Sequence, residues 1–311
     1  ATSATSASAA APSAAAGDVL VTLDAAFLEG HGIQRVLHGD FGRVALLDMD
    51  KPLVPHAHSE CHVLLKAMGA DTYFSVNGHK QPLTDETAVL VNAWEPHYYA
   101  HQPNAPRTLI LALYIEPSWL SALQRPLALS ARPDFFLQRG VQLNRPMRRI
   151  ADALIAEMMS FTLSDQDLVQ ELLSDLTVSI CESFSDYRHL DRMRVTVPAG
   201  FYDARIRRAN QYLTDHYAED IRMDELAARC GLSRAHFFSL FRKNTGITPH
   251  LMHNMIRMKK ACESLGSARS GSLGNISESL GFTEQGHFTR FFRNHLGAAP
   301  SQYQRVVDRC S

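Results

Sequence analysis

The chain has 311 residues, of which 45% are hydrophobic and 20% are charged, and its formal net charge is −1. This balance is typical of a soluble globular protein with room for two domains, and it excludes a disordered or membrane-embedded chain. The longest apolar runs, such as residues 109–115, are too short to span a bilayer. The five cysteines are scattered and form no C-x-x-C pair, which favours a reducing cytoplasm over a disulfide framework or a thiolate zinc site.

The charge is unevenly distributed along the chain. Residues 194–311 contain 17 Lys and Arg against 10 Asp and Glu, a balance of +7, and the remaining 14 basic and 22 acidic residues leave −8 for residues 1–193. A basic part joined to an acidic part is typical of a polyanion-binding module attached to a different kind of domain. We therefore expect the C-terminal part to contact a nucleic acid.

The N-terminal part begins with a segment of low complexity. Residues 1–17 are almost purely Ala, Ser and Thr, without the basic start and apolar middle of a secretory signal, so we expect a disordered tail. In residues 18–144, short apolar or alternating runs are separated by turn residues, and Asn77-Gly78 is the strongest hairpin signal. The pattern predicts an antiparallel sandwich or small barrel, with strands near 44–49, 61–65, 72–76, 88–92 and 108–115.

Histidines are concentrated in this first part. The spacing His56-x-His58-x-x-x-His62-x6-Gly69, followed by Pro96-His97, resembles the two motifs of the cupin superfamily, with His62 where cupins usually hold Glu. The resemblance implies a cupin-like effector-sensing domain over residues 18–144. Two histidines at i and i+2 on a strand face the same side, and a hairpin can bring His62 and His97 alongside.

Two interpretations of this cluster stay open. His56, His58, His62 and His97 can hold a divalent metal such as zinc, iron or manganese, or they can form the polar lining of an effector pocket without metal. Aromatic residues are the candidates for the apolar part of such a pocket. The predicted pocket residues are His56, His58, His62, Tyr73, Trp94, His97 and Tyr99.

The apolar period changes to a helical one near Arg145. Met147, Ile150, Leu154 and Met158 predict one helix, and Leu168, Leu172, Leu176 and Ile180 predict a second, with a junction near Ser164-Asp165. The stripe of the second helix either packs against its own domain or forms a dimer seam. We expect residues 145–200 to be a helical dimerisation region that ends in an interdomain linker over 188–200.

The remaining residues, 201–311, are helical in pattern and contain a duplicated motif. A helix over Met223–Cys230, a turn at Gly231-Leu232-Ser233 and a helix over Arg234–Asn244 form a helix-turn-helix, in which Gly231 permits positive φ and Ser233 is a good N-cap. The pattern recurs over residues 276–293, where Gly281 matches Gly231 and Phe292-Arg293 matches Phe241-Arg242. Two copies in register predict a doubled recognition unit.

Residues 206–307 resemble the C-terminal domain of the AraC/XylS family of bacterial transcription activators. Its most specific part is the second unit's G-F-T-x-x-x-H-F-x-R-x-F-R run, followed by Gly297, Pro300 and Tyr303. The resemblance implies two helix-turn-helix units joined by a connecting helix at His250–Leu265. The expected fold class is therefore α+β: an N-terminal cupin-like β-barrel, a helical dimerisation and linker region, and an all-α domain of two helix-turn-helix units.

The resemblance also implies which side chains meet DNA. The base readers would be Arg234, Ala235, Phe238 and Ser239 in the first unit and Gln285, Gly286, His287, Thr289 and Arg290 in the second. Arg290 can make a bidentate contact with guanine and Gln285 with adenine, whereas Ala235 and Phe238 offer only apolar contact, so we expect the first helix to read sequence weakly. Arg242, Lys243 and Arg293, at the far ends of the helices, are better placed for phosphates.

The leading hypothesis is a cytoplasmic, homodimeric, sequence-specific DNA-binding regulator, expected to be an activator that contacts RNA polymerase and responds to a small-molecule effector, with no enzymatic activity. The alternative is a metal-dependent cupin enzyme with an accessory helical domain, which the duplicated motif disfavours. An architectural DNA-binding protein is disfavoured because the rest of the chain is acidic.

Overall fold

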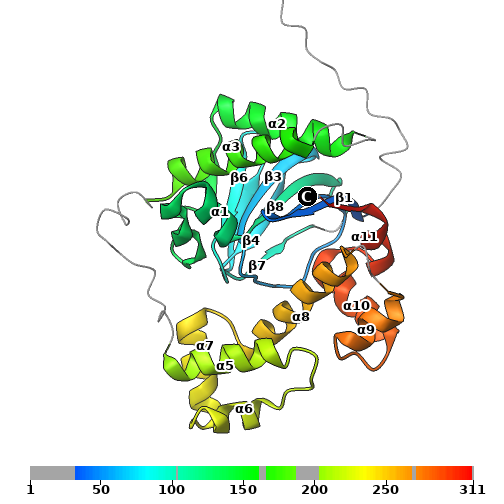
Figure 1. Cartoon of the computed structure of the whole chain (residues 1–311). Coiled ribbons are helices and arrows are strands. Elements are labelled where there is room, and N and C mark those ends of the chain that lie inside the picture. Colours follow the sequence, from blue (N-terminus) through cyan, green and yellow to red (C-terminus); the bar gives the residue numbers. More distant parts are fainter. Residues whose placement is uncertain (1–31, 103, 161–165, 187–202, 268–270, 310–311) are drawn as a thin grey trace, which may run out of the picture.

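The computed structural model describes residues 32–102, 104–160, 166–186, 203–267 and 271–309, and the predicted tail (1–17) and linker (188–200) lie outside them. A β-sheet domain is followed by helices on two sides, so the chain has the predicted α+β architecture (Figure 1). None of the helices described is long and apolar enough to cross a membrane.

The main sheet has seven strands in the order β10-β1-β2-β8-β3-β6-β9, and a smaller sheet has the order β5-β4-β7. All pairs are antiparallel except β1 with β10. Asn77 and Gly78 join β4 to β5 with φ values of 51° and 80°, as a type I′ hairpin turn requires, so the predicted hairpin is confirmed. The strands are β1 Gly32–Gly39, β2 Gly42–Met49, β3 Cys61–Gly69, β4 Thr72–Val76, β5 His79–Leu83, β6 Thr87–Val91, β7 His97–Tyr99, β8 Thr108–Ile115, β9 Gly140–Gln142 and β10 Val307–Arg309.

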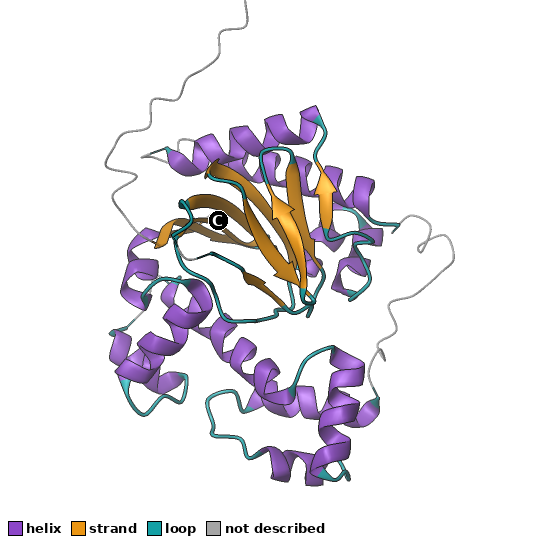
Figure 2. Cartoon of the chain, turned by 180° about the vertical axis from the view of Figure 1, so that it is seen from behind, coloured by secondary structure: helices purple, strands orange, loops and turns teal. Residues whose placement is uncertain are grey.

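Both faces of the main sheet are covered, which is why its strands contain nearly continuous apolar runs. In β2, Val44 and Leu46 belong to one core, whereas Ala45 and Leu47 belong to a second core on the opposite face. Figure 2 shows the sheet between two groups of helices. The sheet therefore contributes side chains to two cores, one on each of its faces.

The first face is covered by the helices that follow the sheet in sequence. These are α1 Pro117–Leu123, the 3₁₀ helix η2 Arg125–Ala131, α2 Arg145–Met159 and α3 Gln166–Phe184. Leu154 and Met158 of α2 and Leu176 and Ile180 of α3 are fully buried against this face. The predicted pair of helices is confirmed, and packing within the domain accounts for the buried part of the α3 stripe.

The C-terminal helices form two helix-turn-helix units at opposite ends of a long helix, α8 (Figure 1). Their turns have the predicted chemistry: Gly231 has φ +67°, Gly281 has φ +77°, and Ser233 accepts a hydrogen bond from the His236 backbone N–H. Helix α8 corresponds to the expected connecting helix. The bounds are α5 Ala204–Asp215, α6 Met223–Arg229, α7 Arg234–Thr245, α8 Pro249–Leu265, α9 Leu273–Ser279, α10 Gln285–Leu296 and α11 Pro300–Val306.

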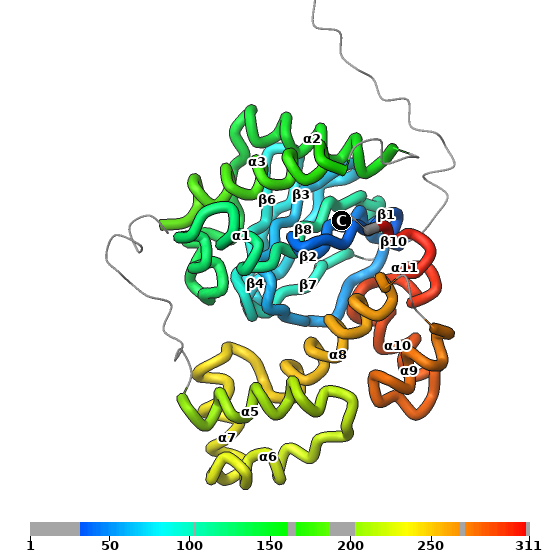
Figure 3. The backbone as a smooth tube through the Cα atoms, viewed as in Figure 1, coloured from blue at the N-terminus to red at the C-terminus, as the bar shows by residue number. Residues whose placement is uncertain are grey.

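The two units differ in where their apolar residues are buried. Phe237 and Phe241 of the first unit share a small core with Ile206 of α5. Phe288 and Phe292 of the second unit belong instead to the core on the second face of the sheet. The second unit is also joined to the sheet by β10, which pairs with β1 beside the C-terminus (Figure 3). The segment predicted as one DNA-binding domain, residues 201–311, therefore has no single core of its own among the residues described.

Candidate functional site

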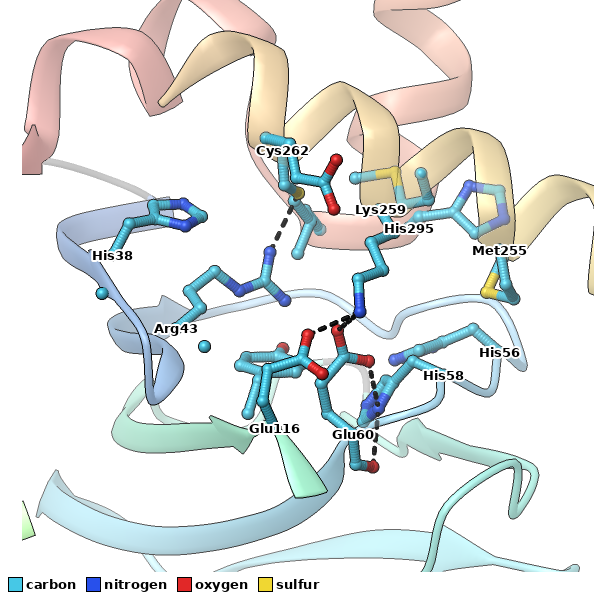
Figure 4. A pocket seen from close by; sticks show the side chains of 16 residues that line it. His38, Arg43, His56, His58, Glu60, Glu116, Met255, Lys259, Cys262 and His295 are labelled. Carbon is cyan, nitrogen blue, oxygen red and sulfur yellow. Dashed lines mark hydrogen bonds and ion pairs between the residues drawn. The ribbon is translucent and has the colours of Figure 1, made fainter. Parts of the chain in front are cut away.

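A cavity of about 210 Å³ lies between the sheet and α8, not inside the β-domain alone (Figure 4). The β1–β2 hairpin, the segment before β3, the end of β8, α8 and the end of α10 all contribute to its wall. Its lining includes His38, Arg43, His56, His58, Glu60, Tyr114, Glu116, Met255, Met258, Lys259, Cys262, His295 and Leu296. A neighbouring cavity of about 370 Å³ shares His58, Glu60 and Lys259 with it and extends to Trp94 and α5.

Lys259 links α8 to the sheet at this cavity. Its Nζ lies 3.0 Å from a Glu60 carboxylate oxygen and 2.5 Å from one of Glu116. Burial alone would raise the pKa of Glu60, but the neighbouring His58 and the Lys259 ammonium outweigh it and lower that pKa to about 2. Burial and the neighbouring Glu60 charge raise the pKa of Glu116 above its usual value. The three groups form an ion-pair network that spans the two halves of the molecule.

Arg43 is a cation of a different kind in the same wall. Its guanidinium carbon lies 3.7 Å from the centre of the Tyr114 ring, and its Nη1 donates to the Cys262 sulfur at 2.9 Å. Arg43 is half-buried, and no carboxylate among the residues described pairs with it. A partly buried guanidinium without a counter-ion favours the binding of an anionic group.

The histidines predicted to cluster lie at the side of this cavity. His56 and His97 form an isolated β-bridge, with His56 N to His97 O at 3.0 Å and His97 N to His56 O at 2.8 Å. One ring nitrogen from each of His56, His58 and His97 lies within 4.8 Å of the other two. His62 is outside this group, with its Nδ1 2.8 Å from His58 Nε2. Of the four histidines predicted as metal ligands, three therefore lie close enough together to hold a metal ion, and His62 lies beside them.

These histidines are held neutral by their surroundings. Burial lowers the pKa of His58 to about 3, against the opposing effect of Glu60, and burial together with the nearby His58 lowers the pKa of His97 to about 3. Burial and neighbouring histidines also lower the pKa values of His56 and His62. Neutral imidazoles keep a lone pair, which either a metal ion or a hydrogen-bond donor can use.

The aromatic residues predicted for the pocket are placed differently from one another. Trp94 lines the second cavity. Tyr73 is 44% exposed, because on β4 it alternates with the buried Thr72 and Phe74. Tyr99 is fully buried in the core and lies 3.2 Å from the Thr72 hydroxyl. Tyr73 and Tyr99 therefore line neither of these two cavities.

Sequence reasoning missed the charged residues of the cavity, Arg43, Glu60, Glu116 and Lys259. They come from four separate segments, so no local motif contains them. The available signal was Lys259 itself, which lies at helical spacing between Met255 and Cys262 on the buried side of α8. A lysine within an apolar stripe indicates a buried partner or ligand.

The predicted base readers lie on the outer sides of α7 and α10. Arg234, Ala235, Ser239, Gln285, Gly286, His287 and Arg290 are exposed, and Phe238 and Thr289 are half-buried. Arg242, Lys243 and Arg293, predicted for phosphates, are exposed in the last turns. Arg234 pairs with Asp224 at 2.7 Å. No ion-pair partner of Arg290 occurs in the part of the chain that the structure describes.

Comparisons with known proteins match both halves of the chain. Residues 49–177 match the model of an AraC-like ligand binding domain, and residues 226–306 match that of a helix-turn-helix domain. The MmsAB operon regulatory protein of Pseudomonas aeruginosa is 32% identical over 31% of this chain and 31% of its own length. The activator RhaS of Shigella sonnei is 23% identical over 82% of this chain and 88% of its own. Five curated relatives match the chain over only 31% to 45% of their own length.

Two solved structures share the fold across most of the chain. Apo ToxT of Vibrio cholerae has a TM-score of 0.55 at 11% identity and covers 88% of this chain and 100% of its own. ToxT described as bound to an unsaturated fatty acid has a TM-score of 0.52 at 13% identity and covers 85% of this chain and 94% of its own. At these identities the likeness establishes the arrangement of a β-domain and two helix-turn-helix units, and no more.

Proposed function

We propose, from the premise that this chain belongs to the AraC family of regulators, that it binds DNA sequence-specifically and controls transcription in response to a small-molecule effector. The observation that carries the proposal is the pair of recognition helices, α7 and α10, whose polar residues face outward from opposite ends of α8. Exposed Arg, Gln and Ser side chains on such helices can reach base edges in the major groove.

Selection of bound duplexes from a random DNA pool tests sequence-specific DNA binding. We expect an enriched sequence whose affinity falls steeply with salt, because Arg242, Lys243 and Arg293 neutralise phosphates. Arg290→Ala should relax discrimination at one base pair by about 1–3 kcal/mol. Arg125→Ala, which removes an exposed arginine of η2, is the matched control and should bind as the parent protein does. Binding that is indifferent to sequence would exclude this function.

We place the effector in the cavity between the sheet and α8. Met255, Met258 and Leu296 offer apolar contacts there, and Arg43 offers a positive charge without a counter-ion, so the effector is expected to be a small apolar molecule with an acidic group. A ligand that contacts both the sheet and α8 changes the free energy of their arrangement, which alters how α7 and α10 are presented to DNA. The fatty acid bound to ToxT is one acid of this general class.

Thermal unfolding in the presence of small carboxylic acids and their neutral amides tests this placement. Acids that bind should raise the melting temperature, since binding to the folded state alone adds stability by mass action, and their amides should not. Arg43→Gln should abolish the difference between acid and amide, whereas Arg125→Gln, at an exposed arginine outside the cavity, should preserve it. Equal stabilisation of both proteins by an acid would place the acidic group elsewhere.

The regulator proposal includes partners beyond DNA and effector. Homodimerisation through the α2–α3 region and contact with RNA polymerase belong to it, and sedimentation of the full chain tests the first of these. The proposed function requires no metal cofactor, because DNA reading and effector binding use side chains alone. The relatives named above are regulators, which disfavours the metal-dependent enzyme.

A further inference from the structure

We propose that Asp224 is a positioning residue for DNA reading, which holds Arg234 ready to contact one guanine and so gives the first helix-turn-helix unit its own sequence preference. The inference rests on the proposed function and deepens it, because it assigns specificity to a residue outside the recognition helices. The sequence predicted that α7 reads weakly, since Ala235 and Phe238 offer only apolar contacts. The surroundings of Arg234 change that expectation.

Arg234 stands where a base reader is needed. It is the first residue of α7, and its side chain is 59% exposed. The N-terminal residues of a recognition helix are the ones that contact base edges in the major groove. An arginine that moves freely loses rotamer entropy when it binds, so a neighbour that orients the side chain beforehand favours binding.

Two neighbours orient the Arg234 side chain. Its Nη1 donates to Oδ1 of Asp224 on α6 at 2.7 Å. Its guanidinium carbon lies over the ring of Phe238, 5.4 Å from the ring centre, one turn further along α7. Nη2 and Nε of Arg234 make no hydrogen bond within the part of the chain that the structure describes. A guanidinium has five N–H donors, so these two atoms remain available for the O6 and N7 acceptors of a guanine.

The second unit has the same position without the acid. Asp224 is the second residue of α6, and Gly274 is the second residue of α9, the equivalent helix. A Cβ added to Gly274 would lie 3.8 Å from Oε1 of Gln285, the first residue of α10. The position therefore faces the start of the recognition helix in both units, and only the first unit has a carboxylate there. The two units thus differ in how firmly their first reader is oriented.

The effect of Asp224 is expected on DNA selectivity and not on folding. Both partners of the ion pair are more than half exposed, and such pairs contribute little to the stability of the free chain. The Asp224 charge repels phosphates, so its removal should strengthen binding to every sequence. Glu225 is a matched control, because it is also an exposed acid in the first turn of α6 but pairs with Arg222, at 3.0 Å.

Binding of the selected duplex, its single-base variants and random DNA by the full chain is the test. Asp224→Asn should bind random DNA about twofold more tightly and discriminate at one G·C pair about threefold less well than the parent chain. Glu225→Gln should show only the tighter binding to random DNA. Arg234→Ala should lose about tenfold or more of the discrimination at that same base pair.

A double-mutant cycle tests whether Asp224 acts through Arg234. In an Arg234→Ala chain, Asp224→Asn should cause no further loss of discrimination. An additional loss would overturn the inference, as would unchanged discrimination in Asp224→Asn alone or an equal loss in Glu225→Gln. A gain of discrimination in Asp224→Asn would overturn it too, because the ion pair would then withhold Arg234 from DNA.

Two further observations separate this inference from misfolding and from the proposed function. The melting temperatures of Asp224→Asn and Glu225→Gln should fall by the same small amount, because each variant removes one acid from the first turn of α6. A parent chain that enriches no DNA sequence refutes the regulator proposal and this inference with it. A parent chain that reads DNA no better than Asp224→Asn does refutes the inference alone.

Discussion

In the first helix-turn-helix unit, Phe237 and Phe241 pack in a small core with Ile206, whereas in the second unit Phe288 and Phe292 pack into the core beneath the sheet. Phe292 meets Tyr303 at a ring-centre distance of 5.4 Å, and Tyr303 in turn bonds to His38 of the β1–β2 hairpin. The two copies of the motif thus pack against the β-sheet domain to very different degrees. The second unit is fastened to the sheet, and the first is connected to it mainly through α8.

The turn glycines of the two units also differ in how closely they are packed. A Cβ added to Gly231 would meet nothing within 4 Å, but one added to Gly281 would lie 1.7 Å from the carbonyl oxygen of Ala218. Ala218 belongs to the loop after α5, so the turn of the second unit packs directly against the first unit. Both glycines have positive φ because each forms the turn of a helix-turn-helix unit. Only Gly281 is also required by the close packing around it.

The largest expected effect on stability comes from substitutions in the cores that hold the two helix-turn-helix units. Phe292→Ala and Phe241→Ala each remove a fully buried ring, at a cost of about 3–5 kcal/mol. Phe292→Ala should also accelerate hydrogen exchange of β1 amides, because its cavity opens beneath the sheet, whereas Phe241→Ala should leave β1 protected. Unchanged exchange of β1 in Phe292→Ala would show that the second unit is not coupled to the sheet.

The glycine pair gives the next largest effect. Gly231→Ala should cost about 1 kcal/mol, the strain of a non-glycine residue at positive φ. Gly281→Ala should cost about 3 kcal/mol, because overpacking against Ala218 is added to that strain. Denaturant unfolding of both variants measures the difference. Equal costs would mean that the loop after α5 moves aside freely.

The phosphate contacts should be alike in the two units. Arg242→Ala and Arg293→Ala each remove one exposed cation from the last turn of a recognition helix. Each variant should weaken binding to all DNA sequences to a similar degree and reduce the salt slope by about 1. Titrations over a range of salt concentrations measure both slopes, and a change in only one variant would mean that a single unit contacts DNA.

The smallest effect concerns the contact between α8 and the loop after α5. His253 of α8 lies with its Nε2 3.0 Å from the Tyr217 carbonyl, and burial lowers its pKa despite this hydrogen bond. The unfolded chain therefore binds a proton at His253 more readily than the folded chain, and stability is lost as pH falls below about 6.5. His253→Gln should lose less stability between neutral pH and pH of about 5 than the parent chain, as urea unfolding would measure. An identical pH dependence in both proteins contradicts this assignment.

Much of the fold was accessible from local patterns. The hairpin at Asn77-Gly78, the helices before and after Gly231, and the connecting helix all follow from turn chemistry, capping and periodicity over short distances. Most of the predicted readers on α7 and α10 are exposed for the same reason, since the apolar positions of an amphipathic helix determine which residues remain outside. The cavity was not accessible, because Arg43, Glu60, Glu116 and Lys259 meet only after the sheet and α8 have packed together.

The doubled helix-turn-helix, the β-domain before it and the histidine motif can be predicted from the order of the residues alone, because each depends on spacings of a few residues. Three other features become visible only in the folded chain: the second unit shares the core of the sheet, the cavity lies between the sheet and α8, and three of four histidines come together. These depend on contacts between residues far apart in the chain, such as His38 and Tyr303, which are 265 positions apart. No local periodicity records which surfaces will pack.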